Sequence, residues 1–286
     1  MLIGGNFSTV NGVNRNGIAR LNADGSVDGR FVAEISSSGN SIHSVLAQPD
    51  GKILIGGEFF SVDQAHYYGL ARLSADGSLD SSFNHVFPEN GSPVPVGNIV
   101  LQPDGKILIT GNFFHVHGAR RDYIARLDAD GSLDNTFDAG SYSDDPAAQY
   151  VRGASSITLH PDGSLFVLGD YYPGDDQYLQ GAYHLNANGS VDANFNPSGG
   201  LPFDVRSVAV QPDGKVLISG GFLTVNGVAR PYLARLYGDF TGNDAPAVAI
   251  TSPPDGSSFV APANVAVQVT ASDSDGDIAR VDVLFR

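Results

Sequence analysis

Two short strings recur along the first 240 residues and constrain the fold more than any other feature. QPDGKILIGG at 48–57 has further copies that begin at residues 102, 160 and 211. ARLSADGSLDSSF at 71–83 has copies that begin at 19, 125 and 183, and a shortened one, ARLYGDF, at 234–240. The two turn glycines of each complete copy keep the spacing of Gly51 and Gly77, while the segment between copies varies in length. A constant module therefore alternates with a variable segment, which is typical of solenoids, propellers and arrays.

Both strings read as β-hairpins. Pro-Asp-Gly and Ala-Asp-Gly suit three-residue hairpin loops, because glycine takes the left-handed position. A strand is predicted before each Pro-Asp-Gly turn, at 42–48, 96–102, 154–160 and 205–211. Another is predicted after each turn, at 52–55, 106–109, 164–167 and 215–218. Two hairpins give about four strands per unit, the size of a propeller blade. Radial packing of several blades would cover the exposed edges and apolar faces of each one.

The second hairpin predicts a pairing register. With Ala75-Asp76-Gly77 as the loop, Leu73 lies opposite Leu79 and Arg72 lies opposite Asp80. The equivalent polar pairs in the other copies are Arg20 with Asp28, Arg126 with Asp134, and His184 with Asp192. The exchange of arginine for histidine keeps a residue that can be positively charged. These are therefore interpreted as structural cross-strand pairs rather than catalytic residues.

Composition agrees with a turn-rich β protein and excludes several classes. Of the 31 acidic residues only three are glutamate, and aspartate populates turns. Hydrophobic residues at 42% argue against disorder. The net charge of −15, without a basic run, argues against nucleic-acid binding. The lack of cysteine excludes disulfides and thiolate chemistry, and no apolar run is long enough for membrane insertion. The oligomeric state stays open.

The repeats resemble the delta-60 family of bacterial β-propellers over about residues 1–240. The resemblance rests on PDGKILIGG followed at fixed spacing by ARL-x-ADGSLD-x-x-F. It implies an all-β propeller of about five four-stranded blades, with the terminal blades incomplete. It also implies an extracellular or bacterial cell-surface location, and no defined enzymatic function. The N-terminus lacks an export signal, and we expect the chain to be a piece of a longer protein that carries one.

A second module is expected after residue 240. Residues 241–246 read as a linker, and 247–286 alternate apolar and polar residues near 247–251, 264–271 and 278–285. This part resembles the start of a bacterial immunoglobulin-like domain. Such a sandwich needs about 100 residues. We therefore expect a truncated module that is poorly ordered or loosely docked.

Calcium is the one cofactor that the sequence raises. Asp128, Asp130 and Asp134 have the D-x-D-x-x-x-D spacing of oxygen-ligand loops. The other copies lose one or two of these carboxylates, and a hairpin whose aspartate caps its own turn explains the string equally well. We favour the turn, so no cofactor is expected, with calcium as the alternative. His115 and His117 are likewise interpreted as loop residues rather than metal ligands.

Binding through the variable segments is the favoured function. The segment 84–95 carries Phe87, and 138–152 carries Tyr142, Asp144, Asp145 and Tyr150. Exposed aromatic residues beside acids suit an extracellular glycan or protein. The alternative is a secreted glycoside-processing enzyme with two carboxylates across a central pocket. The predicted innermost strands hold no carboxylate, and only Asp204 lies beside one. The sequence therefore predicts a non-catalytic scaffold, adhesion or ligand-binding region.

Overall fold

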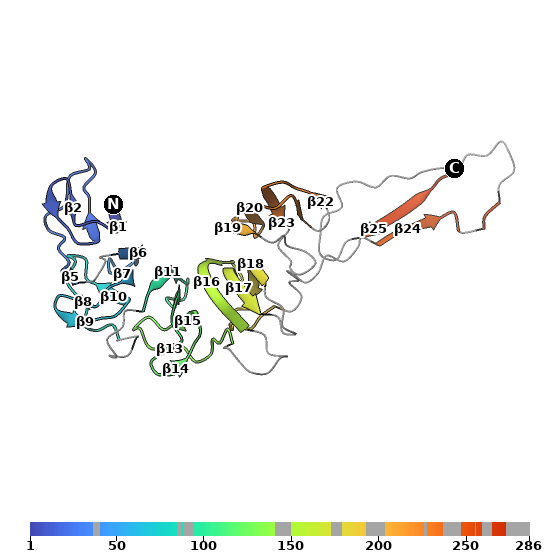
Figure 1. Ribbon diagram of the computed structural model, residues 1–286. Coiled ribbons are helices and arrows are strands. Elements are labelled where there is room, and N and C mark those ends of the chain that lie inside the picture. The colour runs from blue at the N-terminus through green and yellow to red at the C-terminus, as the bar shows by residue number, and fades with distance from the viewer. Residues whose placement is uncertain are drawn as a thin grey trace.

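Every regular element that the structure describes is a β-strand (Figure 1). The computed structural model describes residues 1–36, 41–84, 87, 94–140, 150–172, 179–192, 204–225, 228–236, 247–254, 256–258 and 265–272. In these ranges there is no helix long and apolar enough to cross a membrane. The strands confirm the predicted all-β class.

Antiparallel sheets of the same topology repeat along the chain and form the blades. The second blade is β6 (Ser41–Ala47), β7 (Ile53–Glu58) and β10 (Leu70–Leu73), and the third is β11 (Val96–Leu101), β12 (Ile107–Gly111) and β15 (Ile124–Leu127). The fourth is β16 (Tyr150–Leu159), β17 (Leu165–Tyr172) and β18 (Leu179–Leu185), and the fifth is β19 (Val205–Val210), β20 (Val216–Gly220) and β23 (Leu233–Leu236). The first blade consists of β1 (Leu2–Gly4) and β4 (Ile18–Arg20).

The hairpin turns have the predicted register. The amide of Gln48 donates to Lys52 across the Pro-Asp-Gly turn, and the amide of Ser74 donates to Ser78 across the Ala-Asp-Gly turn. The turn glycine Gly77 has φ of 96°, a conformation that side chains disfavour. The predicted fourth strand is a single bridge in the first four blades, as between Leu73 and Leu79. Its backbone bonds to the preceding strand flank this bridge, from Ser74 to Ser78 and from Asp80 to Arg72.

A short outer hairpin, which the sequence analysis missed, connects the second and third strands of four blades. These hairpins are β2 (Thr9–Val10) with β3 (Val13–Asn14), β8 (Ser61–Val62) with β9 (Ala65–His66), β13 (His115–Val116) with β14 (Ala119–Arg120), and β21 (Thr224–Val225) with β22 (Val228–Ala229). In the first blade Asn11 and Gly12 both have positive φ, which fits a type I′ turn. Strands of two residues leave too short an alternation to read from sequence.

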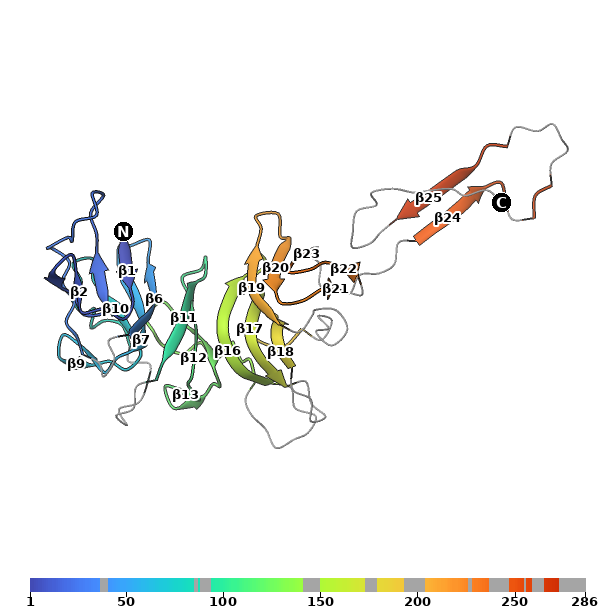
Figure 2. The same cartoon turned by 45° about the horizontal axis from the view of Figure 1, so that its top comes forward.

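The blades lie in an arc, with the first and fifth at its two ends (Figures 1 and 2). The strands β6, β11, β16 and β19 lie toward the concave side, and β8–β9 and β13–β14 lie on the outer side (Figure 1). Since neighbouring strands are antiparallel, connections alternate between the two faces of the arc. The Pro-Asp-Gly and Ala-Asp-Gly turns share one face, here called the turn face. The other face, here called the variable face, carries the bases of the short hairpins and the residues that lead into each innermost strand. The tips of the short hairpins reach back along the outer side to the Ala-Asp-Gly turns, as Asp63 does to the amide of Leu79.

The hydrophobic core lies between blades rather than within one. Ile124 of the third blade packs in one cluster with Val151 and Ile157 of the fourth. The phenylalanines that end the first three repeats, Phe31, Phe83 and Phe137, are 1% exposed or less, and each packs in the cluster shared with the next blade. Each blade therefore buries its apolar face against its neighbour, as radial packing requires.

One hairpin follows the blades. It pairs β24 (Ala247–Ser252) with β25 (Gln268–Ser272), which overlap two of the three segments predicted after residue 246. The third predicted segment, 278–285, lies outside the described residues. Val248 and Ile250 of β24 are about 60% exposed, so this hairpin does not bury the apolar side of β24.

Candidate functional site

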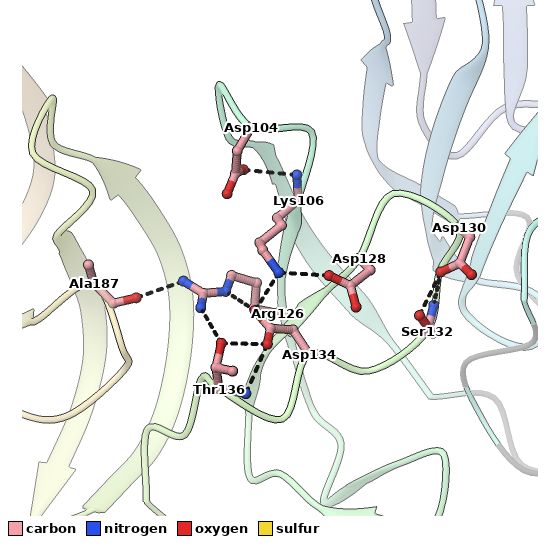
Figure 3. Close-up of polar contacts among 9 residues, drawn as sticks. All are labelled: Asp104, Lys106, Arg126, Asp128, Asp130, Ser132, Asp134, Thr136 and Ala187. Carbon is pink, nitrogen blue, oxygen red and sulfur yellow. Dashed lines mark hydrogen bonds and ion pairs between the residues drawn. The ribbon is translucent and has the colours of Figure 1, made fainter.

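Ion pairs occupy the four cross-strand positions named from the sequence. The Nε atoms of Arg20, Arg72 and Arg126 lie 2.7–2.8 Å from the aspartate opposite, and His184 Nδ1 lies 2.9 Å from Asp192. Arg126 Nη1 also donates to the carbonyl of Ala187, in the Ala-Asp-Gly turn of the next blade, at 2.6 Å (Figure 3). Its guanidinium lies over the ring of Phe137.

The same contacts recur between other blades, and we call the set the arginine bracket. Arg20 Nη1 donates to Ala75 at 2.5 Å, and Arg72 Nη1 donates to Ala129 at 2.6 Å. Each arginine therefore joins its own hairpin to the turn of the following blade. Sequence reasoning found the partner within the blade from the hairpin register. It missed the partner 55 or more residues away, because nothing local signals that contact.

Asp134 stays ionised although its side chain is only 4% exposed. Burial raises the pKa of this carboxyl, but hydrogen bonds from Thr136, Lys106 and Arg126 outweigh burial and hold the pKa well below the usual range of aspartate. The Lys106 Nζ lies 2.9 Å from Asp134 and 2.7 Å from Asp128 (Figure 3). The bracket is thus a satisfied charge network with a structural role.

The calcium hypothesis for Asp128, Asp130 and Asp134 is not supported by this geometry. The ammonium of Lys106 lies between Asp128 and Asp134, where a cation would have to bind. Asp130 accepts bonds from the amide and hydroxyl of Ser132 in its own turn (Figure 3). Within the described residues no three His, Asp or Glu side chains gather as a metal site. His117 instead contacts the carbonyl of Gly131.

The fourth blade forms its bracket with histidine and serine in place of arginine and lysine. His184 occupies the arginine position and Ser164 the lysine position. His184 contacts Asp192 through Nδ1 and the Ser164 hydroxyl through Nε2, both at 2.9 Å. Burial lowers the pKa of His184, against the opposing effect of Asp192. The Ser164 hydroxyl, unlike a lysine ammonium, hydrogen-bonds to the histidine ring without adding a charge.

The innermost strand of each complete blade carries a β-bulge at the same place on the variable face. The pairing register shifts between Ile42 and Ser44 in β6, and equivalent shifts occur in β11, β16 and β19. The bulged residues are His43, Gly97, Ser155 and Arg206. The recurring glycine opposite the bulge is required. A Cβ at Gly57 would overlap the carbonyl of Ser41, and the other blades are alike. Each bulge therefore presents a residue that differs between blades on a backbone that is the same in all of them. Bulges of this kind are common next to binding and active sites.

Two cavities lined by described residues lie between neighbouring blades. The larger, about 370 Å³, lies between the short hairpin of the first blade, with Asn14, Arg15 and Asn16, and the second blade, with Glu34 and Gln64. The Nε of Arg15 is buried and has no partner among the described residues. Amides, a guanidinium and one carboxylate thus line this cavity, all of which hydrogen-bond to polar ligands.

The second cavity, about 310 Å³, lies between the fourth and fifth blades. The bulged Ser155 and Arg206 line it together with Asp204. Arg206 Nε donates to Asp204 at 2.8 Å, and this pairing lowers the pKa of Asp204. Asp204 is the one carboxylate among the lining residues. Neither cavity presents the pair of carboxylates that glycoside hydrolysis uses.

Of the side chains predicted to bind ligand, the structure describes only that of Phe87. Phe87 was expected to be exposed, and this is wrong. It is 3% exposed and packs against Phe113 with ring centroids 5.4 Å apart. A large apolar side chain in a loop gains more by entering the interface between blades. Tyr142, Asp144 and Asp145 lie outside the described residues, as does the side chain of Tyr150. The structure instead points to bulges and short hairpins.

Two family models match the chain. Residues 1–31, 48–83, 102–137, 160–195 and 211–239 match the family described as a domain of unknown function (DUF5122) beta-propeller. Residues 246–285 match a bacterial Ig domain. These matches confirm both resemblances found in the sequence. No curated protein matches the chain.

Several solved bacterial structures are similar at low identity. The extracellular domain of BT4673 from B. thetaiotaomicron is 13% identical, with a TM-score of 0.40, over 78% of this chain and 25% of that one. A protein of unknown function from Bacteroides caccae is 17% identical, with a TM-score of 0.34, over 77% and 81%. PorZ, a surface component of the type-IX secretion system of Porphyromonas gingivalis, is 12% identical, with a TM-score of 0.30, over 89% and 32%. The chain thus spans about a quarter to a third of BT4673 and PorZ.

Proposed function

Because the chain belongs to the DUF5122 β-propeller family, whose function is unknown, we propose that it is a non-catalytic binding module whose variable face holds an extracellular carbohydrate. The supporting observation is that both described cavities are lined by residues of a variable segment or of a bulge, and that each presents hydrogen-bonding groups with a single carboxylate. Side-chain amides, guanidinium and carboxylate groups together match the donors and acceptors of sugar hydroxyls.

The repeat architecture supports the same proposal. The turn face keeps one sequence from blade to blade, whereas the variable face changes in its bulged residues and in its variable segments. In repeat proteins the face that collects such variation is often the binding face. The bacterial Ig match beside the propeller supports an exported, surface-exposed protein, in which the propeller serves as a scaffold or adhesion region.

A glycan array followed by calorimetry on the bound glycans tests the proposal. We expect binding that Glu34→Gln and Arg15→Met weaken, since both side chains line the larger cavity. Lys215→Met, on the turn face, is the matched control and should bind normally, because Lys215 lines neither cavity and pairs with Asp213 at the surface. Binding lost equally in all three variants, or no glycan bound, would overturn the proposal.

The alternative, a secreted glycoside-processing enzyme, is tested in the same samples. Asp204 lines the second cavity, and its pairing with Arg206 lowers its pKa and favours the ionised form. Incubation of bound glycans with the wild-type chain and with Asp204→Asn should leave them intact in both cases. Release of reducing ends by the wild-type chain alone would favour the enzyme.

A further inference from the structure

Tyr123 of the third blade holds a backbone conformation that a large side chain rarely adopts. Its φ is 66°, in the left-handed region, where a side chain costs free energy that glycine does not. Gly17 and Gly69 occupy the same position in the first and second blades, with φ of 73° and 70° and the same backbone hydrogen bonds. Glycine therefore suffices to build this position. A tyrosine that is kept there against the backbone preference points to a function of its side chain.

The ring of Tyr123 meets that of Phe114 at the base of the short hairpin β13–β14. The two ring centroids lie 5.2 Å apart, and the ring planes make an angle of 72°. In such an edge-to-face contact each ring keeps one face that the other does not cover. Phe114 is 48% exposed, although the third blade has a neighbour on each side (Figure 1). These two residues, here called the aromatic pair, thus present aromatic surface to solvent within the packed arc.

Charged groups lie beside the aromatic pair. The amide of Arg121 donates to the Phe114 carbonyl at 3.0 Å, so Arg121 is the cross-strand neighbour of Phe114. Arg121 Nη1 lies 3.8 Å from Asp138, whose side chain is 58% exposed. A guanidinium and a carboxylate next to exposed rings can hydrogen-bond to the hydroxyl groups of a ligand that packs on those rings.

A sugar ring fits this surface better than a protein partner does. A stable protein interface buries about 800 Å² on each side, around an apolar centre. The neighbours of Phe114 on the hairpin, His115, His117 and Arg120, are polar and exposed, so the apolar area is confined to two rings. A pyranose ring matches it, because its C–H groups pack on aromatic faces and its hydroxyl groups bind charged side chains.

We propose that the aromatic pair binds a pyranose ring of a glycan, with Arg121 and Asp138 as partners for its hydroxyl groups. This inference rests on the proposed function and adds to it a contact on the variable face that is separate from both cavities. Neither cavity has an aromatic residue among its lining residues. The aromatic pair therefore supplies the apolar contact that the two cavities lack.

Affinity electrophoresis in gels that contain xylan, mannan or mixed-linkage β-glucan tests the proposal. Phe114→Ser and Tyr123→Gly introduce the residue types of Ser8 and Gly69 at the same repeat positions, so both variants should fold. Each should weaken the affinity for the bound polysaccharide roughly three- to tenfold, which is the contribution of one aromatic contact. Tyr232→Gly is the matched control, because it removes a tyrosine with φ of 68° from a blade that has leucine in place of Phe114. It should bind like the wild type.

The outcomes separate this inference from the proposed function. A wild-type chain that no polysaccharide retards would overturn both. Retardation that Glu34→Gln and Arg15→Met weaken, but that Phe114→Ser and Tyr123→Gly leave unchanged, would overturn the aromatic pair alone. An equal loss of affinity in Tyr232→Gly would also count against the pair, since the effect would then not be specific to the third blade.

Fluorine NMR of the chain labelled with 3-fluorotyrosine gives a local readout. The Tyr123 signal, assigned by its loss in Tyr123→Gly, should shift when a hexasaccharide of the bound polysaccharide is added. The Tyr232 signal, assigned in the same way, should stay in place. A Tyr123 signal that does not move while the hexasaccharide binds would refute the site.

Discussion

Replacing Arg126 by methionine tests how much one arginine bracket stabilises the propeller. The substitution keeps most of the side-chain volume and removes the donors to Asp134, Thr136 and Ala187. A buried hydrogen bond to a charged group contributes about 1.5–3 kcal/mol, and breaking a buried ion pair costs about 3–5 kcal/mol. Asp134 is not orphaned, because Lys106 and Thr136 still bind it. We therefore expect a loss near the lower limit, about 3 kcal/mol.

Urea titration followed by circular dichroism measures this loss as a lower transition midpoint. Arg30→Met, which changes an exposed arginine, is the control and should leave the midpoint unchanged. Amide exchange should rise first at the contact between the third and fourth blades, since stability in repeat arrays is local.

A double variant tests the reasoning about the shared carboxylate. Arg126→Met together with Lys106→Met leaves Asp134 buried without a cation. The combined loss should therefore exceed the sum of the single losses, whereas independent sites would add within about 0.5 kcal/mol. Additive losses, or an Arg126→Met midpoint equal to that of Arg30→Met, would refute the argument.

Three further predictions follow from the turns and the fourth blade. Gly77→Ala should cost about 2 kcal/mol or more and Gly25→Ala about half as much, because only Gly77 adds a backbone overlap to the strain of positive φ; equal midpoints would contradict this. His184 has a lower pKa in the folded than in the unfolded protein, so its contribution to the free energy of unfolding is complete above about pH 6.5 and is lost as the pH drops. When the pH is lowered, the urea midpoint of His184→Gln should therefore fall less than that of the control His43→Gln, which keeps His184. Chelator or added calcium should leave the melting temperature unchanged, because Lys106 already neutralises Asp128 and Asp134; a calcium-dependent rise would restore the metal hypothesis.

Local chemistry explains what the sequence could predict. The loop residues Ala75-Asp76-Gly77 determine a hairpin of known length, and the pairing of Arg72 with Asp80 follows by counting outward. The blades and their order follow from the repeat for the same reason. These features depend on residues fewer than about 30 positions apart in the chain.

The remainder depends on contacts between blades. The bond from Arg72 to Ala129 and the burial of Phe87 need two blades already packed. The bulge at His43 had one sequence signal, the recurrence of Gly57, but its cause is a carbonyl on another strand. The candidate cavities escaped prediction because their walls come from two blades, and each wall alone reads as an ordinary polar loop.

The arginine bracket also affects how such a chain can change its length. Each bracket uses one residue from a repeat and one carbonyl from the next, as with Arg72 and Ala129. Duplication or deletion of one whole unit therefore recreates the same bracket at the new junction, with no compensating substitution. A gene encoding this architecture can gain or lose blades by recombination between its own repeats and still encode a folded protein, since each blade interacts mainly with its nearest neighbours.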